Sequence, residues 1–210
     1  MNTVNVTPNI FRESAKGFDK IRIEDALLES REIFLTDMVT PDTMTSLLKQ
    51  LLFLSRKDPQ AEITLYINSP GGDVDSGLVV YDFMKAIPAP VLTVCIGEAA
   101  SMGAVLFLAG DRRVMFPHSR IMIHDPSFGN GLGAGMKPDE IEEQLKKLKE
   151  VRDTEVQIIS SITGRNEEEI REKTRKDSWF SAGEALSFGL ATEIVTDETI
   201  DIFTAPKKGV

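Results

Sequence analysis

Ser101 stands where a predicted strand gives way to a predicted helix, and its hydroxyl is the first candidate for chemistry. The apolar, β-branched run at residues 91–96 (VLTVCI) predicts a buried strand, and residues 97–100 (GEAA) predict a tight turn before the helix. The first N–H groups of a helix have no internal partners and favour nearby negative charge, which suits a nucleophile that becomes an oxyanion. Two interpretations stay open here: Ser101 is a nucleophile, or it only caps the helix.

The chain has only two histidines, and they differ in their surroundings. His124 ends a predicted strand at residues 120–124 (RIMIH). At that position it is either a general base for a neighbouring serine or a hydrogen-bonded structural residue. His118 lies in a polar turn (PHSR) and is predicted to be exposed and inert.

A pair of glycines in the turn at residues 69–72 (SPGG) is a third candidate. Adjacent glycines let a backbone N–H point into a site with no side chain in the way, as an oxyanion hole requires. The same tetrapeptide is also an ordinary turn, and the residues alone favour that interpretation.

Strands and helices alternate around these candidates. The patterns predict strands at residues 32–36, 62–68, 111–116 and 120–124, and helices at residues 41–57, 75–86 and 138–163. This order is typical of an α/β domain with parallel strands joined by right-handed crossovers. Catalytic groups in such folds gather at the carboxyl ends of the strands, where Ser101 and the SPGG turn both stand.

The predicted helix at residues 138–163 is the longest. At 1.5 Å per residue it would reach roughly 39 Å, which is more than a compact domain of this size needs. Its first half has many charges and only a narrow apolar seam, so we expect part of it to protrude and to meet another subunit. Asn166 is predicted to cap the next helix, and Ser181 with Glu184 forms a capping box before the last one.

Composition limits the partners and the location. The 210 residues carry a net charge of −9, which argues against nucleic acid or an anionic membrane surface as the main partner. The single cysteine, Cys95, is predicted to be a core residue, and no run of 18 apolar residues or basic leader occurs, so we expect a cytoplasmic protein. Residues 127–135 are rich in glycine but lack a nucleotide-binding motif, and we predict no metal site.

Four motifs resemble the Clp protease proteolytic subunit family (ClpP), in the same order along the chain. They are YINSPGGDVDSG (66–77), GEAASMGA (97–104), SRIMIHDP (119–126) and KDSWFSAGEALSFGL (176–190). The resemblance implies Ser101 as nucleophile, His124 as general base and Asp177 as the acid that orients it. It also implies an oxyanion hole built from the backbone N–H groups of Gly72 and Met102.

The resemblance further implies a fold and an assembly. The fold would be a crotonase-like α/β spiral with a protruding handle helix, divided into a flexible axial arm (1–19), a protease domain (20–197, handle about 127–163) and a tail (198–210). The chain would form two stacked heptameric rings, a tetradecamer that encloses the active sites. An AAA+ ATPase such as ClpX, ClpA or ClpC would feed in unfolded proteins, so ATP would be used by the partner and this subunit would need no cofactor.

Two other functions remain as alternatives. A crotonase-type acyl-CoA enzyme would share the fold but leave Ser101 and His124 unexplained, and a non-catalytic ring subunit would only support a partner. The chain also departs from the family pattern. Lys176 stands for the usual arginine that reaches the opposing ring, Asp125 stands for the usual glutamine, and the segment at residues 127–139 is altered and longer. These departures concern ring contacts and the possibility of a mixed ring with a paralogue.

Overall fold

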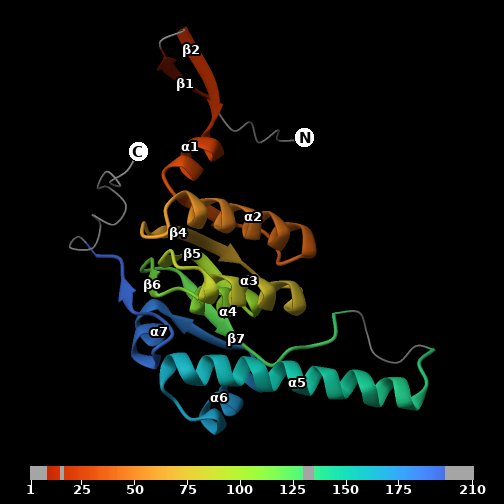
Figure 1. The fold of residues 1–210 in the computed structure, drawn as a ribbon. Helices are drawn as coiled ribbons and strands as arrows, with labels where there is room; N and C mark the ends of the chain where they lie inside the picture. Colours follow the sequence, from red (N-terminus) through yellow and green to blue (C-terminus); the bar gives the residue numbers. More distant parts are fainter. Residues whose placement is uncertain (1–8, 15–16, 130–134, 197–210) are drawn as a thin grey trace, which may run out of the picture.

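The computed structural model describes residues 9–14, 17–129 and 135–196, which form a mostly parallel sheet with helices around it (Figure 1). The sheet strands are β3 (Glu32–Leu35), β4 (Ile63–Ser69), β5 (Val91–Ala100), β6 (Arg112–Met115), β7 (Arg120–Ile123), β8 (Ser178–Ser181) and β9 (Glu193–Ile194). The helices are α1 (Ile23–Glu29), α2 (Pro41–Lys57), α3 (Val74–Ala86), α4 (Met102–Leu108), α5 (Pro138–Thr163), α6 (Glu167–Thr174) and α7 (Ala182–Phe188). The predicted α/β class is therefore confirmed.

Strand β5 is the centre of the sheet, because three strands pair with it. The main order is β3-β4-β5-β6-β9, and β7 also pairs with β5, at residues 98–100. All of these pairings are parallel, and β8 joins the other edge of β7 in the antiparallel direction. The tight turn predicted at residues 97–100 is wrong, since these residues continue the strand in order to pair with β7.

The two faces of the sheet carry different apolar clusters. Along β4, Leu65 and Ile67 belong to the main core with residues of α2, α3 and α4, whereas Tyr66 packs against a small cluster on the opposite face. Leu92 and Val94 of β5 form part of that second cluster. In Figure 1, α2, α3 and α4 lie together along one side of the sheet. The opposite face is left with a thin apolar cover.

Local sequence signals mark the N-terminal ends of three helices correctly. Thr40 caps α2, its side chain accepting a hydrogen bond from the Thr43 N–H, and Pro41 is the first helical residue. Asn166 caps α6, and Ser181 with Glu184 forms the predicted capping box at the start of α7. These side chains satisfy backbone N–H groups that the helices themselves leave unpaired.

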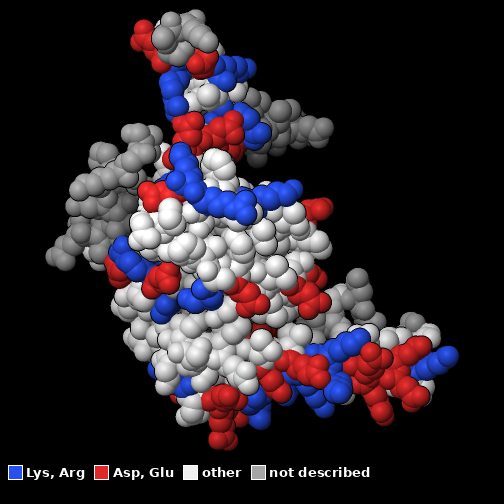
Figure 2. All heavy atoms as spheres, in the orientation of Figure 1, with Lys and Arg blue, Asp and Glu red and all other residues white. Residues whose placement is uncertain are grey.

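Helix α5 has the bounds that its sequence predicts, and it protrudes. Its buried residues, Glu155, Val156 and Ile159, all lie in the second half. Figure 1 shows the other end extending past the body of the molecule, and Figure 2 shows Lys, Arg, Asp and Glu side chains crowded along it. The first half of α5 is therefore held by few contacts within the chain.

The N-terminal region contains regular structure that the sequence pattern did not reveal. Strands β1 (Asn9–Ser14) and β2 (Gly17–Arg22) pair as an antiparallel hairpin, where we expected an arm without a clear period. Residues 1–8 and the tail at residues 197–210 lie outside the described residues, so the predicted arm, domain and tail boundaries stay predictions. No helix in the part of the chain that the structure describes is long and apolar enough to cross a membrane.

Candidate active site

Ser101 occupies a strained turn between β5 and α4. Its φ is 54° and its ψ is −125°, a conformation that costs a non-glycine residue on the order of 1–3 kcal/mol. The turn is held by its backbone, since the Ser101 N–H donates to the Met122 carbonyl at 2.9 Å. A strand-to-helix turn of this kind lifts a nucleophilic hydroxyl out of the chain and exposes it.

The hydroxyl of Ser101 does not cap the helix that follows it. Ser101 holds the N-cap position of α4, but its side chain makes no capping hydrogen bond. Its Oγ instead lies 2.8 Å from His124 Nε2. The geometry thus removes the capping interpretation and brings together two of the residues that the sequence singled out.

The third residue, Asp177, reaches His124 through the pairing of two strands. In the antiparallel pair of β7 and β8, Ile123 lies opposite Ser178, so the next residue on one strand and the preceding residue on the other are also neighbours. Asp177 Oδ1 lies 3.2 Å from His124 Nδ1. The Asp177 side chain is 66% exposed and that of His124 is 24% exposed. Ser101, His124 and Asp177 therefore form one continuous chain of contacts.

The two glycines of the SPGG turn have backbone conformations that side chains rarely adopt. Gly71 has φ +91° and Gly72 has φ +146°. A Cβ on Gly71 would lie 2.7 Å from the Ser101 Cβ and 2.9 Å from the Met102 nitrogen. A Cβ on Gly72 would lie 2.2 Å from the Val39 carbonyl oxygen. Glycine is required at both positions, because Gly71 packs directly against the chain around Ser101 and Gly72 packs against the backbone of Val39.

Two backbone N–H groups beside Ser101 are left without a partner among the described residues. Gly72 forms a parallel bridge with Val39, but that bridge uses the Gly71 carbonyl and the Asp73 N–H. Met102 is the first residue of α4, so its N–H has no partner within the helix. Met102 is fully buried, and its side chain belongs to the main core. These amides suit an acceptor that carries negative charge.

A cleft of about 900 Å³ opens over these groups. Its lining includes Gly72, Ser101 and His124. Apolar lining residues come from four segments, namely Met38, Val39, Val74, Leu78, Pro126, Phe128, Leu148 and Val151. The handle helix α5 forms one wall, so the protruding element also shapes the site.

Asp125, which departs from the family pattern, acts electrostatically on a buried acid of α5, Glu155. The Asp125 backbone N–H donates to the Thr174 carbonyl at 2.6 Å, and the buried Oδ1 of Asp125 has no hydrogen-bond partner among the described residues. Glu155 is only 8% exposed. Burial, with a further contribution from the negative charge of Asp125, raises the pKa of Glu155 to about 7. Sequence reasoning missed Glu155, although its spacing from Val151 and Ile159 places it on the buried face of the helix.

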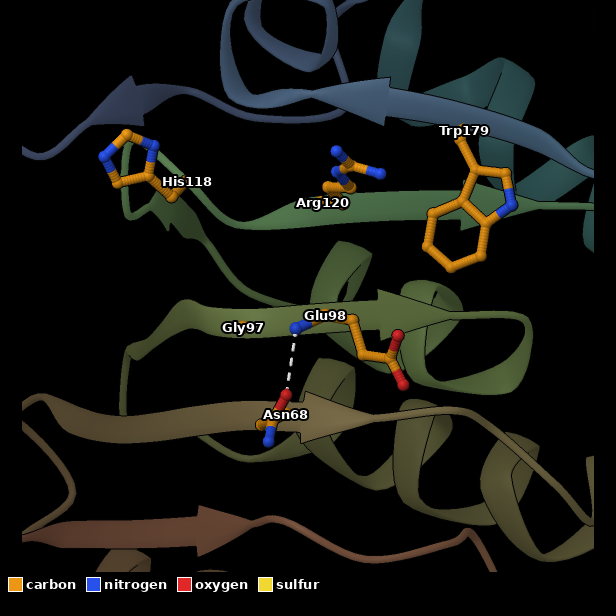
Figure 3. Close-up of a pocket in the computed structure, with 6 residues that line it drawn as sticks. All are labelled: Asn68, Gly97, Glu98, His118, Arg120 and Trp179. Atoms are coloured by element: carbon orange, nitrogen blue, oxygen red, sulfur yellow. Dashed lines mark hydrogen bonds between the residues drawn. The ribbon is translucent and has the colours of Figure 1, made fainter.

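His118 lies in another pocket, away from Ser101. A hollow of about 340 Å³ lies on the outer face of the sheet, the face opposite α2, α3 and α4. It is lined by Asn68, Gly97, Glu98, His118, Arg120 and Trp179 (Figure 3). In Figure 3 the His118 ring lies at one end of this hollow, and the hydrogen bond drawn joins the Glu98 N–H to Asn68 Oδ1 at 3.0 Å. His118 is exposed, as predicted. No group of three or more potential metal ligands occurs among the described residues.

Comparison with known proteins identifies the family of the chain. The Clp protease family model matches residues 15–198. The ATP-dependent Clp protease proteolytic subunit of Deinococcus radiodurans is 39% identical over 201 residues, which cover 95% of this chain and 96% of that protein. The protein therefore belongs to the Clp protease family, whose members are serine peptidases.

Proposed function

We propose that the chain hydrolyses peptide bonds with a triad of Ser101, His124 and Asp177. The Nδ1–H of His124 would donate to Asp177, which leaves Nε2 free to accept the Ser101 proton during attack on the peptide carbonyl. The developing oxyanion would accept hydrogen bonds from the N–H groups of Gly72 and Met102. His124 would then return the proton to the leaving amine, and water would release the acyl group by the reverse sequence.

One observation carries this proposal, namely the 2.8 Å contact between Ser101 Oγ and His124 Nε2 at a strained serine that caps nothing. Strain without a structural use is typical of functional positions. The family membership removes the acyl-CoA alternative. A non-catalytic ring subunit would have no reason to keep the serine, the histidine and the unpartnered amides together, and this favours a catalytic subunit.

The proposed substrate is an unfolded protein, and the proposed setting is the cytoplasm. Within the Clp family, the proteolytic subunit self-assembles and works with a Clp ATPase. We propose that this chain forms two stacked heptameric rings fed by an AAA+ ATPase such as ClpX, ClpA or ClpC. The ATP would then be consumed by that partner, and the hydrolytic subunit would need no cofactor.

Exposed apolar side chains on two different surfaces support the ring. Phe53 of α2 and Val79 of α3 are 54% and 57% exposed on the helical side. Ile96 and Trp179 are 37% and 47% exposed on the outer face of the sheet. A contact between two different surfaces repeats from subunit to subunit, and it closes a ring when the rotation allows. The large exposure of Asp177 also leaves this residue accessible to a neighbouring subunit.

The test is hydrolysis of a short fluorogenic peptide by the parent chain and by Ser101→Ala. We expect the parent to cleave the peptide and the variant to lose at least about 10³-fold in rate, because the nucleophile is removed. Sedimentation of both proteins serves as the control for assembly. Equal hydrolysis by two equally assembled proteins would refute the assignment.

A further inference from the structure

The wall of the cleft that begins at Gly72 carries two carboxylates. Asp73 and Asp75 both line the cleft, and both residues are exposed. Asp73 directly follows Gly72, so its Cα is about 3.8 Å from the Cα of a residue proposed to bind the scissile carbonyl. Side chains of the substrate that flank the scissile bond would therefore pass close to these carboxylates.

Both carboxylates are available to a ligand. Asp73 accepts a hydrogen bond from the Ser76 N–H at 2.9 Å, and its hydrogen bonds with Ser76 lower its pKa, so it is ionised at neutral pH. The salt bridges formed among the described residues involve neither Asp73 nor Asp75. Within the described part of the chain, no Lys or Arg is paired with either carboxylate.

The opposite wall of the cleft does not compensate for this charge. Lys147 of α5 lines the cleft, but its ammonium lies 2.9 Å from a Glu143 carboxylate. Glu150, about one turn further along the same helix, also lines the cleft, and its carboxylate lies 4.0 Å from the Lys146 ammonium, so both charges on this wall are paired. The cleft as a whole therefore presents a negative potential to its substrate.

We propose that Asp73 and Asp75 make the cleft select peptides with a lysine or arginine residue next to the scissile bond. The proposal rests on the proposed function, and it adds a substrate class to it. Val74 and Leu78 line the cleft beside the two carboxylates. A long cationic side chain would pack its methylene groups on these apolar residues and direct its charge toward the carboxylates. Acidic side chains at the same position would be repelled.

The experiment compares arginine with citrulline, a neutral side chain of nearly the same shape. Quenched fluorescent peptides carry one or the other residue before the scissile bond, and a second pair carries them after it. At 50 mM NaCl the parent should show a higher kcat/KM for at least one arginine peptide, by about 3- to 10-fold for each carboxylate that it approaches. At 0.5 M NaCl this ratio should fall toward one, because salt screens exposed charges.

Matched variants assign the preference to the two residues. Asp73→Asn and Asp75→Asn should each lower the arginine-to-citrulline ratio. The fold should persist, because asparagine is as good an N-cap as aspartate at position 73 and because Asp75 is exposed. Asp82→Asn removes the same charge from an exposed position of α3 that does not line the cleft, and it should leave the ratio unchanged. A parent ratio near one for both peptide pairs, or a ratio insensitive to the cleft variants, would overturn the proposal. If the parent cleaves neither the arginine peptides nor the citrulline peptides, the result would instead contradict the proposed peptidase function.

Discussion

Replacing Glu155 by glutamine should stabilise the protein at alkaline pH but much less at acidic pH. Glu155 is buried on α5 beside Asp125, and its pKa is raised from an ordinary value of 4.5 to about 7. Between these two values the folded protein binds a proton that the unfolded chain has lost, so the free energy of unfolding falls as pH rises. The free energy of unfolding therefore has its full value below about pH 4.5, and the loss caused by ionisation of Glu155 is complete above about pH 8.

The size of this loss follows from the pKa difference. A rise from 4.5 to about 7 corresponds to about 3 kcal/mol once the carboxyl is ionised in both states. Glutamine has nearly the same shape and never ionises. We therefore expect Glu155→Gln to raise the free energy of unfolding by about 1 kcal/mol at pH 5 and by about 3 kcal/mol at pH 8.

The assay is urea unfolding followed by circular dichroism, at fixed protein concentration and ionic strength, at both pH values. Glu142→Gln is the matched control, because Glu142 lies on the same helix but is exposed. Asp125→Asn should give part of the gain at pH 8, since it removes the charge that acts on Glu155. A gain that does not depend on pH, or that equals the gain of the control, would refute the reasoning.

Three further predictions concern the triad, the core and the ring. Asp177→Asn should lower the peptidase rate on the order of 10³-fold in a fluorogenic assay, because it disturbs the His124 tautomer, and a rate within tenfold of the parent would contradict this role. Arg31 is 8% exposed and donates hydrogen bonds to four backbone carbonyls, those of Leu54, Asp58, Ala61 and Glu62. Arg31→Met should therefore lower the free energy of unfolding, measured by urea unfolding, by about 3 kcal/mol. A loss below about 1 kcal/mol would show that water replaces these hydrogen bonds. Lys176, which forms no salt bridge among the described residues, should hold an opposing carboxylate less firmly than arginine would. Lys176→Arg should therefore raise the fraction of double rings in high salt, as measured by sedimentation. A parent double ring that already resists high salt would contradict this prediction.

Much of the fold was predictable because its signals are local. The strand that ends at Ser101 is a continuous apolar run, α2 begins with a threonine cap and a proline, and α5 keeps one apolar stripe over 26 residues. Each of these patterns depends only on residues that are close to one another in the chain, so a single sequence is enough to recognise it.

The missed elements depend on contacts between distant segments. Strand β8 exists because residues 178–181 pair with residues 120–123, and the same kind of pairing turns residues 97–100 from a turn into strand. No short-range pattern encodes a partner that far along the chain. The hairpin of β1 and β2 was missed for the opposite reason, since its exposed strands lack the apolar alternation that marks a buried face.

The candidate site was predictable in part. Ser101 was predicted just beyond the carboxyl end of one strand and His124 at the carboxyl end of another, so their meeting could be expected from parallel-sheet geometry. Asp177 had no signal of its own and was identified through the family resemblance. The electrostatic interaction of Asp125 with Glu155 joins residues thirty positions apart. The one signal for it in the sequence is an acidic residue within the apolar stripe of the helix.

The measurement that tests the central claim most directly is covalent labelling with a fluorophosphonate, followed by peptide mapping by mass spectrometry. A serine becomes reactive toward this probe only when a base removes its proton and nearby donors hold the oxyanion. We predict one adduct, on Ser101, in the parent chain, and no adduct there in His124→Ala. Absence of labelling in an assembled parent protein, or equal labelling of Ser101 in the His124 variant, would contradict the account.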